Sequence, residues 1–124
     1  MMMLSAPHSF CKTMIIDFSK IEEQLLPHFR EGDGAFVMRA FADEKVKVMQ
    51  GVLVPGASIG MHTHVQNSEI IFMCQGEGTM TMADGNVETL LPGYVHYCKM
   101  GEGHSLKNNG KETVVFLAVI PEHH

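Results

Sequence analysis

Residues 56–76 place three candidate metal ligands on a segment with the pattern of two short strands joined by a turn. His62 and His64 are two positions apart, and side chains on a strand alternate between its faces, so both imidazoles point to the same side. The residues at 65–68, Val-Gln-Asn-Ser, include turn formers that can reverse the chain and return Glu69 to that side. The segment, which has a glycine at each end, therefore predicts a metal site built on strands.

A second region, further along the chain, offers a fourth ligand. From Gly93 to Asn108 it reads G-x5-K-x-G-x2-H-x3-N, in which the histidine is His104. Together with residues 56–76 it resembles the two motifs of the cupin superfamily, G(x)5HxH(x)3,4E(x)6G and G(x)5PxG(x)2H(x)3N. Lys99 stands where the second motif usually has proline, which would fix φ near about −65°, so we expect a looser turn there. The resemblance implies that one metal ion is bound by four residues: His62, His64, Glu69 and His104.

Most of the remaining chain has the pattern of β-strands. These segments are β-branched, aromatic or alternating, and Gly, Asp, Asn or Pro separates them. They cover residues 35–41, 46–54, 59–64, 69–74, 78–83, 86–91, 94–98, 104–108 and 112–120. Asp84-Gly85 is a strong hairpin signal. Many short strands predict an all-β sandwich or barrel, and the cupin resemblance implies a double-stranded β-helix, or jelly roll.

One segment before these strands has a helical pattern. Ser19-Lys20-Ile21-Glu22 has the form of a capping box, and Leu25 and Leu26 follow Ile21 at helical spacing before Pro27. We therefore expect one short N-terminal helix.

The chain has 124 residues, which suits a single cupin domain over residues 1–124 with its motifs at 56–76 and 93–108. Its formal net charge is −5, and its Lys and Arg residues are scattered, which argues against a nucleic-acid partner. The longest apolar run, 114–120, is far shorter than the roughly 20 residues of a membrane-spanning helix, so we expect no membrane partner.

The cysteines favour a reducing compartment. They are odd in number and irregularly spaced, at Cys11, Cys74 and Cys98, which indicates free thiols rather than a disulfide framework. Residues 1–10 lack the basic start and apolar core of a signal peptide. We therefore expect a cytoplasmic protein.

The donor set suits metal chemistry with exchangeable positions. Three imidazoles and one carboxylate fit a divalent first-row ion, namely Mn, Fe, Co, Ni, Cu or Zn, with one or two positions left for water or substrate. Such an ion beside one carboxylate keeps a formal charge near +1, so we expect a small anionic or chelating ligand. Carbonyl polarisation, water activation and dioxygen chemistry all stay open.

Other polar residues have ordinary interpretations. His8, His28 and His96 are expected to be hydrogen-bonded core or surface residues. Tyr97 is the nearest candidate for a general acid or base, but the pattern does not fix its side of the strand, and a packed tyrosine is favoured. No catalytic residue is assigned.

Two functions remain open at this point. The first is a metal-dependent enzyme of the cupin type, a dioxygenase, isomerase or lyase acting on a small oxygen-rich or carbonyl substrate. The alternative is a metal-containing cupin that binds or senses a ligand without turnover. A storage or structural role would not need all four ligands.

A homodimer is expected from the sheets. Segments 35–41 and 112–120 are apolar on both faces and carry few of the charges or prolines that protect a free sheet edge. Cupins commonly pair through terminal strands and sheet faces, so the resemblance implies the same assembly.

Overall fold

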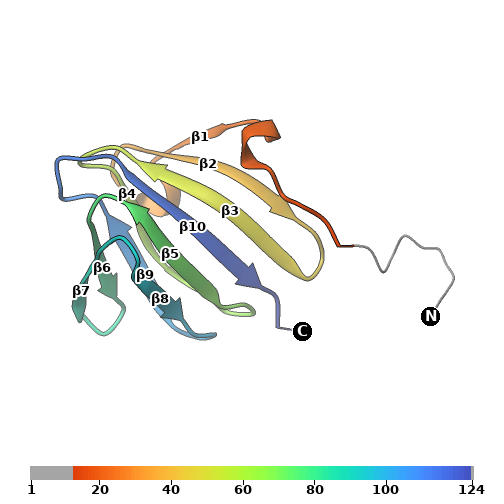
Figure 1. The fold of residues 1–124 in the computed structure, drawn as a ribbon. Coiled ribbons are helices and arrows are strands. Elements are labelled where there is room, and N and C mark those ends of the chain that lie inside the picture. The colour runs from red at the N-terminus through yellow and green to blue at the C-terminus, as the bar shows by residue number, and fades with distance from the viewer. Residues whose placement is uncertain (1–12, 124) are drawn as a thin grey trace, which may run out of the picture.

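A computed structural model describes residues 13–123, which form two antiparallel β-sheets and two 3-10 turns (Figure 1). The turns are η2 (Phe18–Lys20) and η3 (Phe29–Glu31). The strands are β1 (Gln24–Pro27), β2 (Ala35–Ala42), β3 (Val46–Leu53), β4 (Ser58–Thr63), β5 (Glu69–Gln75), β6 (Gly78–Met82), β7 (Val87–Leu90), β8 (Val95–Cys98), β9 (Gly103–Lys107) and β10 (Val114–Pro121).

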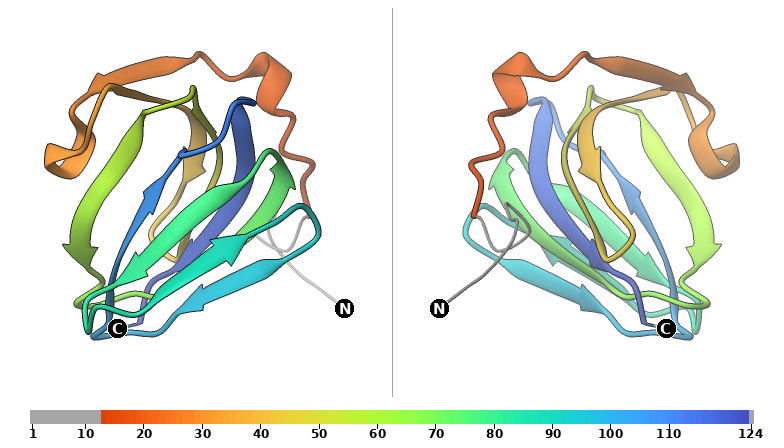
Figure 2. Two further views of the ribbon diagram at one scale, coloured as in Figure 1. Left: turned by 90° about the vertical axis from the view of Figure 1, so that its left-hand side faces the viewer. Right: turned by 90° about the vertical axis from the view of Figure 1, so that its right-hand side faces the viewer.

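The six-stranded sheet has the order β1-β2-β3-β10-β5-β8, and the four-stranded sheet has the order β4-β9-β6-β7. The side views show both sheets wrapping around a shared interior (Figure 2). Phe36 and Phe116 stack in that interior with ring centroids 6.0 Å apart. Gly51 lies so close to the Phe116 ring that a Cβ would have no room. This all-β jelly roll confirms the predicted fold class.

The predicted strands agree with the observed ones to within a residue or two. The Asp84-Gly85 signal is confirmed as the β6–β7 hairpin, in which Gly85 has a φ of 94°. Asn108, from the second motif, is buried, and its amide donates to the carbonyls of Leu53 and Glu112. That residue therefore ties two strand ends together.

The expected N-terminal helix is wrong. Residues 13–123 contain no α-helix; η2 is a single turn, and Gln24–Pro27 forms β1 on the edge of β2. Leu26 pairs with Phe36 on the core side, while Leu25 faces outward and is exposed. An isolated helix this short is marginal in water. The free hydrogen-bonding edge of β2 offers backbone partners and burial that such a helix lacks.

The homodimer was expected because segments 35–41 and 112–120 would form exposed sheet edges, and this placement is also wrong. β2 lies between β1 and β3, and β10 lies between β3 and β5, so both are interior strands. Their apolar outer residues face away from the core on a sheet surface rather than at an edge. Separately, no helix within residues 13–123 combines the length and apolar character needed to cross a membrane.

Candidate metal centre

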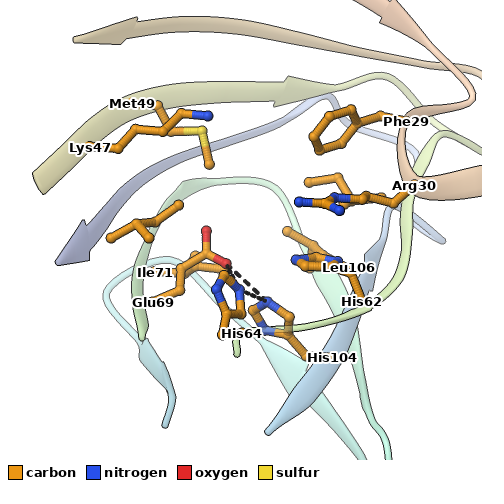
Figure 3. Close-up of a pocket in the computed structure, with 12 residues that line it drawn as sticks. Phe29, Arg30, Lys47, Met49, His62, His64, Glu69, Ile71, His104 and Leu106 are labelled. Atoms are coloured by element: carbon orange, nitrogen blue, oxygen red, sulfur yellow. Dashed lines mark hydrogen bonds and ion pairs between the residues drawn. The ribbon is translucent and has the colours of Figure 1, made fainter. Parts of the chain in front are cut away.

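Three strands of the two sheets bring the four motif residues together (Figure 3). His62 lies on β4 directly opposite His104 on β9. His64 follows the end of β4, where its backbone N–H donates to the Glu102 carbonyl and its carbonyl accepts from Gly101. The chain then reverses, and Glu69 opens β5. The turn at 65–68 predicted for this reversal is present.

The donor atoms of these residues converge closely. Oε1 of Glu69 lies 3.0 Å from Nε2 of His64 and 2.9 Å from Nε2 of His104. The two Nε2 atoms are 3.1 Å apart, and the atoms of the full set, including His62, lie within 4.8 Å of one another. Neighbouring ligands of a six-coordinate ion with bonds of about 2.1 Å are separated by roughly 3.0 Å. The donor set and its spacing therefore fit one divalent ion.

The other ring nitrogen of each histidine is already engaged. Nδ1 of His62 donates to the Gly60 carbonyl at 2.8 Å, because a carbonyl oxygen can only accept. Nδ1 of His64 lies 2.6 Å from Oδ1 of Asn67. These contacts keep a hydrogen on Nδ1, so Nε2, which faces the centre, is the nitrogen that can offer a lone pair to an ion once it carries no proton of its own. The rings are therefore oriented for metal binding by the protein itself.

The electrostatics favour a cation at the centre. Burial raises the pKa of Glu69, but hydrogen bonds with His104 and His64 outweigh it and lower the pKa to about 2. The hydrogen bond to Glu69 raises the pKa of His64, whereas burial lowers the pKa of His62. Glu69 is thus a carboxylate that is 4% exposed, and a buried anion of this kind needs a compensating positive charge.

A small cavity of about 60 Å³ lies over the four residues. It has room for roughly four to six water-sized groups. Its other walls are mostly apolar and include Ile71, two residues after Glu69 on β5, and Leu106, two residues after His104 on β9. Two cationic side chains, Arg30 and Lys47, also line it and border a wider outer depression of about 370 Å³. Neither belongs to a motif, and sequence reasoning missed both.

Residues 49–120 match the family model for the cupin domain. The chain belongs to the cupin family. It is 30% identical over 113 residues to an oxalate-binding protein of Thermotoga maritima, covering 86% of this cupin and 93% of that relative. The crystal structure of a predicted oxalate decarboxylase from the same organism superposes with a TM-score of 0.81 at 30% identity, over 88% of this cupin and 99% of that chain. A sugar phosphate isomerase from Silicibacter pomeroyi shares the fold, with a TM-score of 0.73 at 19% identity over 88% and 76% of the two chains.

His96 has a place in this cupin that sequence reasoning missed. It is buried on β8, as expected of a hydrogen-bonded core residue, but its Nε2 lies 3.1 Å from Nδ1 of His104. Burial and the charge of His104 lower the pKa of His96, so the ring favours its neutral form. For His104 to offer its Nε2 to an ion, its Nδ1–H must donate to His96. His96 stands at a variable position of the second motif, and its contact with His104 joins strands of two different sheets, so no local pattern in the sequence points to it.

Two of the remaining candidates, Tyr97 and Cys74, point away from the cavity. Tyr97 pairs with Ile70 on the outer face of the sheet and is 57% exposed, so it does not reach the cavity. Cys74 is exposed, and Cys98 is buried, with desolvation raising its pKa to about 11. Both are free thiols, as predicted, whereas Cys11 lies outside the described residues.

Proposed function

We propose that this cupin is a metal-dependent enzyme acting on a small chelating carboxylate such as oxalate. One divalent transition-metal ion would be held by the side chains of His62, His64, Glu69 and His104. The observation that carries the proposal is the buried Glu69 carboxylate within about 3 Å of two imidazole nitrogens at the base of a small cavity. When bound, the ion would polarise a carboxylate or carbonyl oxygen as a Lewis acid.

The cavity charge and size support this ligand class. A divalent ion, one carboxylate, Arg30 and Lys47 give a formal charge near +3, which attracts a small dianion. Oxalate has only six heavy atoms, and a small ligand of this kind suits a small cavity. The apolar walls, such as Ile71 and Leu106, keep bulk water from competing for the same polar groups.

Among the reaction classes left open by the sequence, a lyase has the most support. The relative that is 30% identical over nearly the whole chain is a predicted oxalate decarboxylase, and decarboxylation is a lyase reaction. The sugar phosphate isomerase is only 19% identical and supports the fold alone.

A binding function without turnover is the second candidate. Apart from the four motif residues, the described residues lining the cavity include no carboxylate and no imidazole that could act as a general acid or base. An oxalate-binding protein is also among the relatives that are 30% identical. Neither observation requires a chemical step on the bound acid.

One experiment separates the two functions. Untagged protein is loaded separately with Mn, Fe, Co, Ni or Zn and incubated with oxalate, malonate and other small carbonyl acids while product release and the melting temperature are followed. Turnover by the wild type that is lost in a His62/His64/Glu69/His104 alanine variant supports the enzyme. A melting shift without product supports the binding protein, and the absence of both contradicts the proposed ligand class.

The metal found in purified protein is expected to depend on which metal ions were available to it. Affinity for nitrogen and oxygen ligands rises along the series from Mn to Cu, so Zn, Ni or Cu can occupy the site even where Mn or Fe is the working ion. Equal activity with Zn, Mn, Fe and Ni would contradict this expectation. A redox role and a Lewis-acid role cannot both be served by all four ions.

We also propose a homodimer that pairs through the outer face of the six-stranded sheet. Strand pairing aligns apolar residues across this face, as in the row Phe41, Val48, Val119, Ile70 and Tyr97. A large apolar patch on a soluble protein marks an interaction surface. The chain has a net charge of −5, so a face nearly free of charge is the surface on which two copies repel each other least.

Light scattering of the wild type and of two variants tests the dimer. Phe72 is 42% exposed on this face, and Phe72→Glu should shift the mass from about twice 13.7 kDa to 13.7 kDa. Val87→Glu is the matched control, because Val87 is exposed on the four-stranded sheet. A wild-type mass of 13.7 kDa at all concentrations would rule the dimer out.

A further inference from the structure

We infer that Arg30 is the second anchor for the bound acid: its guanidinium pairs with the carboxylate oxygens that face away from the four motif residues, so that the site selects dicarboxylates over monocarboxylates. This inference rests on the proposed function, because it assumes that a carboxylate occupies the cavity.

The backbone around Arg30 has an unusual conformation. His28, Arg30 and Glu31 have φ values of 52°, 55° and 65°, in the left-handed region that non-glycine residues rarely adopt. Such conformations are strained, and they cluster at functional sites where the surrounding structure holds them. Packing from neighbouring residues must therefore hold this turn in place, and the conformation suggests that Arg30 has a functional role.

The restraint is the close packing of this turn against β4. Gly60 lies against the carbonyl of Arg30, and Gly32 lies against the carbonyl of Ser58, so neither position has room for a Cβ. Asp33 and Ser58 exchange two hydrogen bonds of 2.8 Å, one from Asp33 N–H to the Ser58 hydroxyl and one from Ser58 N–H to the Asp33 carbonyl. The turn is thus fixed to the strand that carries His62.

The side chain of Arg30 extends from this turn into the cavity. Figure 3 shows its guanidinium near His62, on the opposite side of the cavity from Glu69. The Phe29 ring lies 5.5 Å from the guanidinium carbon and supports it through a cation–π contact. Within residues 13–123, no carboxylate is within salt-bridge distance of Arg30. Its donors are therefore available to an anion.

The two arginines of the chain, Arg30 and Arg39, differ in their surroundings. Arg39 lies on the outer face of the six-stranded sheet, where it pairs with Glu23 at 3.6 Å and donates to the Phe18 carbonyl. Among the described residues Arg30 has no such partner, and it borders the cavity over His62 and Glu69. A planar guanidinium binds a carboxylate with two parallel hydrogen bonds, which a lysine cannot do. Arg30 is thus suited to recognise a second carboxylate, and Arg39 serves as a matched control.

The test uses full-length protein loaded with Mn or Zn and titrated calorimetrically with oxalate, malonate and acetate. Arg30→Met should weaken oxalate and malonate binding roughly 10- to 100-fold, because it removes a charge-assisted pair. Acetate binding should change by less than about 3-fold, since a monocarboxylate needs only the metal. Arg30→Lys keeps the charge without the planar fork and should fall between the two. Arg39→Met should match the wild type for all three acids.

Metal content is measured in every sample before and after titration, because oxalate can itself remove an ion. Selective loss of dicarboxylate binding in Arg30→Met, with the metal retained, supports the inference. Oxalate affinity within about 3-fold of the wild type overturns it while leaving the proposed function intact. Equal loss for acetate and oxalate also overturns it, because the side chain would then not discriminate. Failure of the wild type to bind any of these acids would overturn both proposals.

Discussion

The floor and the mouth of the cavity differ in how their side chains are held. The floor consists of His62, His64, Glu69 and His104, and the mouth consists of Arg30 and Lys47. The floor residues are attached to hydrogen-bonded strands or their ends, and three of the four are buried. The mouth residues come from an irregular turn and from the start of β3, outside both motifs. The difference indicates that metal binding and ligand selection are separable, so substitutions should affect them independently.

The largest effect is expected at the floor. His64→Ala removes one of the four proposed metal ligands and leaves Glu69 with one fewer hydrogen-bond partner, so metal affinity should fall by more than about 100-fold and ligand binding should be lost with it. Competition with a chromophoric chelator measures the affinity. Lys47→Met is the control at the mouth and should keep the metal. Equal metal loss in both variants would break the distinction between floor and mouth.

A residue behind the floor should have the next largest effect. His96→Phe removes the acceptor for Nδ1 of His104 while keeping a ring in the buried space, and should weaken metal binding about 10- to 100-fold. His96→Gln, whose side-chain oxygen can accept the same hydrogen bond, should recover part of the loss. Nitrogen NMR of His104 should show the hydrogen on Nδ1 in the metal-loaded wild type. An unchanged affinity in His96→Phe would show that His96 only fills space.

The pH dependence of metal affinity should also originate at the floor. The pKa of His64 is raised above its usual 6.5, so protons compete for its Nε2 as pH falls through values above 6.5. His62, whose pKa is lowered by burial, should protonate only at lower pH. Glu69, with a pKa of about 2, stays ionised over this whole pH range. The metal dissociation constant should therefore rise in two stages as the pH is lowered from 8 to 5.5. A constant value over this range would contradict this account.

The smallest effect is expected from Lys47 at the mouth. Its ammonium is half-buried and lacks the paired donors of a guanidinium, so Lys47→Met should weaken oxalate binding only about 2- to 5-fold. Calorimetry on metal-loaded protein gives the comparison with Arg30→Met. A larger loss at Lys47 than at Arg30 would reverse the roles assigned to the two side chains.

The residues of the floor could be predicted because short sequence patterns determine where they lie. Strand parity places His62 and His64 on one side, and the turn formers that follow return Glu69 to it. His104 was placed through the second motif, and the structure brings all four residues together. Their role as metal ligands stays a prediction. The same parity places the wall residues Ile71 and Leu106 on the side of Glu69 and His104.

The mouth was not predictable because it depends on long-range packing. Arg30 reaches the cavity only because Gly32 and Gly60 let its turn approach β4 closely, and no local pattern encodes that approach. The residues just before this turn were predicted to be helical because Leu25 and Leu26 fit a helical spacing. They form a strand that pairs with β2 instead. His96 was missed for a related reason, because its contact with His104 joins two different sheets.

The most direct test is the metal stoichiometry of untagged wild-type protein and of the variant with alanine at His62, His64, Glu69 and His104. Mass spectrometry of metals in purified, dialysed samples gives ions per chain, and the absence of a tag removes adventitious histidines. The wild type should hold one divalent ion per chain and the variant none, with both remaining folded. A variant that still held one ion per chain would show that the metal site lies elsewhere.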